Sequence, residues 1–152
     1  MSSHTEKKII LDTNQILAAG SRWVDPLYHN SNSTAQELLR VIARSHRGMF
    51  CPKIMAEYVE KLLEKGHPKE RVAKLIGLLL GAFEMVTVTS KTCSPVPADP
   101  DDVMFVLCAI DGAADFIVSS DKHLLDLDGA YAAFRILSSE GASIELGISV
   151  SN

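Results

Sequence analysis

Short apolar runs alternate along this chain with longer segments in which apolar residues recur at helical spacing. The short runs are bounded by polar residues, Gly or Pro, as is typical of strands that are buried on both faces of a parallel sheet. The predicted strands cover residues 9–11, 49–51, 85–89, 116–118 and 134–137.

The longer segments carry capping signals at their ends and are predicted to be helices. Ser33 or Thr34 can cap the first of them, Gly66 ends the second, and Pro68 can stand in the first turn of the third. Asp101 or Asp102 opens the fourth. The predicted helices cover about 34–43, 53–64, 68–83 and 101–110, and a short turn or helix begins at 124.

Residues 20–33 and 90–99 are polar and irregular and contain proline, so they are predicted to be loops. The tail after Ser138 receives no element. Alternating strands and helices favour an α/β fold of three α/β/α layers, with a central parallel sheet and right-handed crossovers. We expect a single domain over residues 1–152, with a core from about 7 to 138.

Composition and charge narrow the class of protein. The chain has 152 residues, of which 47% are hydrophobic and 22% charged, as in an ordinary globular protein. A net charge of −4 gives no global basic field to attract nucleic acid, although a local basic rim or bound divalent cations could supply positive charge. No signal-peptide pattern follows the polar N-terminus, and the longest apolar run is too short to span a bilayer. We expect a cytoplasmic protein.

Cysteine and basic residues add little specific chemistry. Cys51, Cys93 and Cys108 form no C-x-x-C motif, and the first and last are expected to be reduced core residues. Basic side chains follow two of the predicted helices, where a solvated face is the usual interpretation and RNA contact the alternative. An aromatic group in the first loop could cover an apolar edge or contact a partner. The basic residues are Arg40, Arg44, His46, Arg47, Lys53, Lys61 and Lys65, and the aromatic group is Trp23, Pro26 and Tyr28.

Four acidic residues stand at the ends of apolar stretches. Asp12 directly follows the first predicted strand and Asp121 comes soon after the fourth strand. Glu57 lies on the second predicted helix, and Asp102 stands at the start of the fourth. The carboxyl ends of the strands in an open α/β sheet border the ligand crevice. Carboxylates that converge there repel one another unless they are protonated or neutralised by a cation. This pattern predicts a metal site.

Each acid also has a structural alternative. Asp12 and Asp121 could form a turn or a helix cap, and Asp102 could stabilise the N-terminus of a helix through the helix dipole. Glu57 could pair with Lys61, four residues later. Together, four acids at strand ends and helix starts are hard to assign to caps alone.

The order and spacing of these motifs resemble the PIN domain, the ribonuclease fold of VapC-type toxins and of RNA-processing nucleases. The resemblance covers roughly Ile9 to Leu137. Ser119 stands where Thr is commoner, which keeps the hydroxyl, and the loop 20–33 departs further. The matching segments are Leu11-Asp12-Thr13-Asn14, Ala56-Glu57, Asp99-Pro100-Asp101-Asp102, Gly112-Ala113-Ala114-Asp115, Ile117-Val118-Ser119-Ser120-Asp121 and Leu124-Leu125.

The resemblance implies metal-dependent hydrolysis of phosphodiester bonds in single-stranded RNA, and hard carboxylate oxygens suit Mg²⁺ or Mn²⁺. Asp12, Asp102 and Asp121 would then be metal ligands, and Glu57 a ligand or the residue that orients the attacking water. Asp99 and Asp101 are alternates for Asp102. Groups that orient these carboxylates and touch phosphate would be Thr13, Asn14, Ser120 and Asp101.

The resemblance also implies partners. The chain would be the toxin of a toxin–antitoxin pair, with a small antitoxin protein and a homodimer as its assemblies. The apolar stripes of residues 34–47 and 53–65 are candidates for the groove that binds an amphipathic partner helix. An RNA-processing nuclease and a catalytically silent RNA- or protein-binding module stay open. A haloacid-dehalogenase-type phosphatase is set aside because residue 14 is Asn, not Asp.

Overall fold

The computed structural model describes residues 5–24 and 33–148. Its sheet is parallel throughout, and the central strand pairs with neighbours on both sides, so that Ile10 lies opposite Met49 and Ile117. The strand order is β3-β2-β1-β4-β5. The strands are β1 (Lys8–Leu11), β2 (Arg47–Phe50), β3 (Glu84–Met85), β4 (Phe116–Val118) and β5 (Arg135–Leu137).

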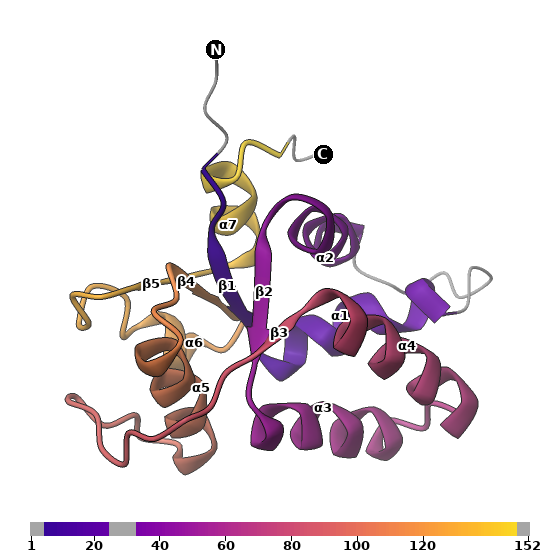
Figure 1. Ribbon diagram of the computed structural model, residues 1–152, viewed down its shortest axis with the longest axis horizontal. Helices are drawn as coiled ribbons and strands as arrows, with labels where there is room; N and C mark the ends of the chain where they lie inside the picture. The colour runs from indigo at the N-terminus through magenta and orange to yellow at the C-terminus, as the bar shows by residue number, and fades with distance from the viewer. Residues whose placement is uncertain (1–4, 25–32, 149–152) are drawn as a thin grey trace.

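Helices cover both faces of this sheet. In Figure 1, α1 to α4 lie to one side of the strands, and α5 and α6 lie to the other. This arrangement confirms the predicted three-layer α/β/α fold. The helices are α1 (Thr13–Val24), α2 (Ser33–Ser45), α3 (Pro52–Glu64), α4 (Lys69–Ala82), α5 (Pro100–Asp111), α6 (Lys122–Leu125) and α7 (Ser139–Glu145).

Helix α1 was not predicted, and the loop expected from residue 20 was wrong at its start. Gly20 lies inside this helix and is buried. A Cβ at this position would stand 3.0 Å from Leu75 Cδ2 and 3.5 Å from Leu62 Cδ2, so the glycine lets α3 and α4 pack closely. The rest of the predicted loop, with Pro26, Tyr28 and the Trp23 side chain, lies outside the described residues.

Strand β3 is shorter than the predicted 85–89. Val86 N–H still donates to Phe50 O at 2.7 Å, but the backbone then leaves the sheet edge. The N–H groups of Thr89 and Ser90 donate to Asp111 Oδ2 at 2.7 and 2.8 Å. A side chain at the end of α5 thus replaces the sheet as the acceptor for these donors.

One helix boundary differs from the expectation, and the expectation that the tail after Ser138 forms no element was wrong. Helix α5 begins at Pro100, with Asp99 as its cap, because Asp99 Oδ1 accepts from the Asp101 N–H at 2.9 Å. The tail forms α7, in which Ser138 caps the first turn by accepting from Gly141 N–H at 3.0 Å. Ala142 of this helix is fully buried, so the tail contributes to the core.

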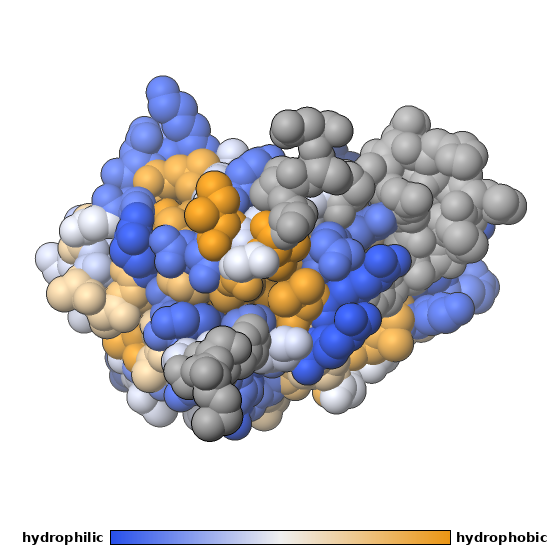
Figure 2. Space-filling model, turned by 90° about the horizontal axis from the view of Figure 1, so that it is seen from above, coloured by the Kyte–Doolittle hydropathy of each residue, from blue (hydrophilic) through white to orange (hydrophobic). Residues whose placement is uncertain are grey.

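The two ends of the sheet differ in character. Figure 2 looks onto the end at which β1 begins and α7 lies, and apolar and polar side chains are mixed across this face. Among the residues described, no helix has the length and apolar character that crossing a membrane requires. The carboxyl ends of the strands, and with them the acidic residues, lie at the opposite end.

Candidate active site

The acidic residues lie where the strand order reverses. From β1 the chain proceeds to β2 and β3 on one side, and then crosses to β4 and β5 on the other. Ligand crevices in open α/β sheets form at such a switch point. Asp12 directly follows β1 and its N–H donates to Val118 O at 2.9 Å, at the end of β4. The backbone therefore holds the two strand ends that border the crevice side by side.

One pocket of about 210 Å³ collects all four predicted acids, and we call it the acidic pocket. Asp12 reaches it from the end of β1, Glu57 from α3, Asp102 from α5 and Asp121 from the start of α6. Ser120, which was predicted to orient the carboxylates, is not among the residues that line this pocket. Its backbone N–H donates a hydrogen bond to Asn14 Oδ1 at 3.3 Å. The acidic pocket is also lined by Thr13, Asn14, Leu17, Lys61, Asp99, Asp101 and Phe105.

Asp12 is buried and held by donors on both carboxylate oxygens. Oδ1 accepts from Thr13 N–H at 2.7 Å, and Oδ2 accepts from Asn14 Nδ2 at 3.1 Å and from Ser119 Oγ at 2.6 Å. Burial raises the pKa of Asp12, while these hydrogen bonds act in the opposite direction. The donors therefore fix the orientation of a carboxylate that still lacks a neutralising charge.

Asp102 is the most strongly perturbed acid of the pocket. Its side chain is 6% exposed, and burial, followed by the charges of Asp12 and Asp121, raises its pKa to about 7. Of the three candidates at the start of α5, Asp99 caps the helix and Asp101 is exposed, so Asp102 is the one that points into the protein. At neutral pH this carboxyl group needs either a proton or a nearby cation.

Glu57 is half-buried and bonds to the chain segment that follows β1. It accepts a hydrogen bond from Thr13 Oγ1. Its pKa is raised by burial and by the charge of Asp12, whereas the bond from Thr13 lowers it. The alternative ion pair with Lys61 does not form, because Lys61 Nζ lies 3.3 Å from Glu64 Oε2. Tertiary contact with Thr13 has replaced the local helical pair.

Asp121 combines a structural role with its place in the pocket. Its Oδ1 accepts from His123 N–H at 2.9 Å, which caps α6. Its own N–H donates to Ser119 Oγ at 2.9 Å. Asp121 therefore caps a helix and also lies in the acidic pocket with the other three acids.

Two residues that the sequence analysis gave no site role organise this region. Ser119 is fully buried and its hydroxyl bridges Asp12 Oδ2 and the Asp121 N–H, which couples the two acids at the switch point. Tyr58, next to Glu57, is also fully buried, and its hydroxyl donates to Leu11 O. A tyrosine on the apolar stripe of a helix needs a hydrogen-bond partner for its hydroxyl. Its position on that stripe is therefore the feature of the sequence from which this contact could have been predicted.

The pocket suits a hard divalent cation by its chemistry. All of its acidic side chains are oxygen donors, and burial together with the charges of neighbouring acids raises the pKa values of Asp12, Glu57 and Asp102, which a bound cation would lower again. Within residues 5–24 and 33–148, no three His, Cys, Asp or Glu side chains are already grouped to hold one ion. Mg²⁺ keeps several waters and needs only one or two carboxylates, so a closed cage is not required.

The chain is similar to known proteins in both sequence and fold. A family model described as the PIN domain matches residues 8–123. The fold is similar to that of a chain in the crystal structure of VapBC2 from Rickettsia felis bound to a DNA fragment from their promoter. The TM-score is 0.59 and the sequence identity 14%, over 86% of this chain and 98% of that chain, so the likeness shows the fold alone. A search of curated proteins gives no match.

Proposed function

Because the chain belongs to the PIN domain family, we propose that it is a divalent-metal-dependent ribonuclease that hydrolyses phosphodiester bonds in single-stranded RNA. The observation that carries the proposal is the convergence of Asp12, Glu57, Asp102 and Asp121 in one pocket at the switch point of the sheet. Caps or isolated ion pairs would not need four acids in one place, whereas a phosphate-binding metal site would.

Three of the acids would bind the metal ion, and neighbouring polar residues orient them. Asp12, Asp102 and Asp121 would hold Mg²⁺ or Mn²⁺, which when bound can activate water and offset charge on the leaving oxygen. Ser119 and Asn14 keep Asp12 in place through their hydrogen bonds.

Glu57 is the group that can take the proton of the attacking water. Its bond from Thr13 orients the carboxylate, and its raised pKa makes it a stronger base than an exposed glutamate. Removing the carboxylate should therefore slow the reaction even where a metal ion is still held.

Cleavage of defined oligonucleotides tests this function. We expect the protein to cut a single-stranded RNA in Mg²⁺ or Mn²⁺, to stop when EDTA is added, and to resume when the ion is restored. Duplex RNA and single-stranded DNA of the same sequence serve as controls for the substrate class. A preparation that cuts RNA equally well in EDTA would contradict the metal dependence.

The same proposal extends to partners. The similar fold occurs in the VapBC2 structure, and we propose that this chain is the toxin of such a pair and binds a small antitoxin. An apolar groove of about 160 Å³ borders α2, and α4 completes it with Leu75, Leu78 and Leu79. The predicted contribution of residues 53–65 to this groove is therefore wrong. Co-expression with the neighbouring small reading frame, followed by a pull-down and by light scattering, tests both the antitoxin and the expected homodimer.

A further inference from the structure

A second pocket adjoins the acidic pocket along the cleft between α3 and α5. Its volume of about 320 Å³ lies at the lower end of the range for pockets that bind small organic ligands, about 300–1,000 Å³. Glu57, Asp101 and Phe105 line both pockets, so the two are continuous. We call the additional space the side pocket. The residues that line it alone include Lys53, Ile54, Ala56, Glu60, Val103 and Met104.

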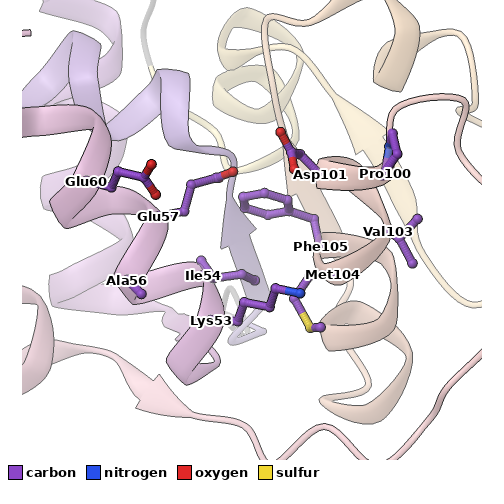
Figure 3. Close-up of a pocket in the computed structure, with 10 residues that line it drawn as sticks. All are labelled: Lys53, Ile54, Ala56, Glu57, Glu60, Pro100, Asp101, Val103, Met104 and Phe105. Carbon is purple, nitrogen blue, oxygen red and sulfur yellow. The ribbon is translucent and has the colours of Figure 1, made fainter. Parts of the chain in front are cut away.

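The side pocket is apolar in its interior and charged at its mouth. Figure 3 shows Ile54 from α3 and Met104 and Phe105 from α5 lying around the space between the two helices. Lys53 extends from α3 across this space toward Met104, whereas Glu57 and Asp101 lie at the end shared with the acidic pocket. The apolar space thus has a cation at one end, whereas Glu60 lies beside Glu57 toward the end where the candidate metal ligands are (Figure 3).

We propose that the side pocket binds the nucleobase of the nucleotide next to the scissile phosphate, and that Lys53 contacts the phosphate on the far side of this nucleotide. The inference rests on the proposed function and adds to it the position at which the enzyme holds a base. Single-stranded RNA offers unstacked bases whose flat faces pack against apolar and aromatic side chains. A methionine thioether is well suited to such a contact because it packs favourably against aromatic rings.

The charges along α3 support this direction of the strand. Lys53 precedes Glu57 by four residues, which is about 6 Å along the helix axis, so both side chains lie on the face that borders the cleft. The chain as a whole carries a charge of −4, and the acidic pocket adds local repulsion of phosphate. Lys53 at the outer end of the side pocket can attract an RNA phosphate without the help of a metal ion.

Methionine methyl groups provide a direct probe of the side pocket. The chain has five methionines, and Met104 alone among the described ones lines this space. We would label the methionine methyl groups with ¹³C in the full chain, assign Met104 by its loss in Met104→Leu, and titrate the four nucleoside 5′-monophosphates in Mg²⁺. The ring current of a bound base should shift the Met104 signal, while the exposed Met85 on β3 stays unchanged. Ribose 5-phosphate, which has no base, is the matched ligand control.

Kinetics on single-stranded RNA supply the second readout. Met104→Ala and Lys53→Gln should each raise KM by about tenfold, which is about 1.4 kcal/mol of binding free energy, with a smaller change in kcat, because each removes one contact to the nucleotide and leaves the acidic pocket intact. Met85→Ala and Lys74→Gln change exposed residues outside the pocket and should match the wild type. The metal-induced shift in melting temperature should be the same in all four variants.

The outcomes separate this inference from the proposed function. A Met104 signal that no nucleotide moves, or that ribose 5-phosphate moves equally, overturns the base-binding site even if the protein cuts RNA. A base-dependent shift in a chain that cuts no RNA supports nucleotide binding in the side pocket and overturns the ribonuclease proposal instead. Equal KM values for Met104→Ala and Met85→Ala would also overturn the assignment.

Discussion

Replacing Asp102 by asparagine should stabilise the metal-free protein at neutral pH. The folded state holds this carboxyl group among other acids and away from water, and these surroundings raise its pKa from 3.8 to about 7. The unfolded chain imposes no such environment. Asn keeps nearly the same shape and hydrogen-bonding capacity but carries no charge, so Asp102→Asn removes the electrostatic cost from the folded state alone.

The size and the pH dependence of the effect follow from linkage. A pKa raised from 3.8 to about 7 corresponds to about 4 kcal/mol of lost stability once the pH is well above 7. The folded state binds the proton more tightly than the unfolded chain, so stability falls as the pH rises from about 4 to about 7. Between pH 5 and pH 7.5, Asp102 alone should lower the free energy of unfolding by roughly 2–3 kcal/mol. Asp12 and Glu57 are raised in the same direction and add to this slope.

Urea unfolding in EDTA at pH 5 and pH 7.5 measures this prediction. At pH 7.5, Asp102→Asn should unfold at higher urea than the wild type, with a difference of about 4 kcal/mol that falls to about 2 kcal/mol at pH 5, and its stability should depend less on pH. Asp101→Asn is the matched control, because Asp101 precedes it on the same helical turn but is exposed, and it should change stability by about 0.3–1 kcal/mol. An Asp102→Asn protein that is no more stable than the wild type at pH 7.5 would show that the buried charge of Asp102 does not destabilise the fold.

Three further sets of substitutions test the metal site, the serine that links its acids, and the packing of the sheet. Asp12→Asn or Asp121→Asn should abolish RNA cleavage and leave the fold intact. Mn²⁺ should raise the melting temperature of the wild type far more than the melting temperatures of these variants, and equal shifts would count against metal binding by these residues. Ser119→Ala removes the hydroxyl that bridges Asp12 and the Asp121 N–H, so urea unfolding should show a loss of about 1–3 kcal/mol, and cleavage should fall as well. Gly48→Ala would place a Cβ 2.5 Å from the Phe83 ring and should cost about 1–3 kcal/mol; wild-type stability would show that the ring can move aside.

The strands of the sheet could be predicted because each is a short apolar run that needs burial on both faces. Residues 9–11 and 116–118 satisfy that condition without reference to the rest of the fold. Helix α1 could not be predicted in the same way, since Gly20 and the polar residues after it favour a loop locally. Only the approach of Leu75 and Leu62 from later parts of the chain explains why a glycine is used within a helix there.

The candidate site shows the same division between local and tertiary information. The position of Asp12 and Asp121 after strands predicts that they meet, because the carboxyl ends of parallel strands share one edge of the sheet. Their hydrogen-bond partners depend on side-chain orientation across elements. Helical spacing favoured Lys61 as the partner of Glu57, but the fold brings Thr13 to it from the end of β1. The hydroxyl of Ser119 became the link between the acids because this residue, not Ser120, points into the core.

If the proposed function is correct, the four acids act together as one metal-dependent site that cuts RNA. The most direct test measures cleavage of a single-stranded RNA by the wild type, Asp12→Asn and Asp126→Asn, purified identically, each in EDTA and in Mn²⁺. Asp126 is an exposed acid at the end of α6 and outside the acidic pocket, so it controls for loss of one negative charge. We expect cleavage by the wild type and Asp126→Asn in Mn²⁺ only, and none by Asp12→Asn. Equal cleavage by Asp12→Asn and the wild type would contradict this expectation.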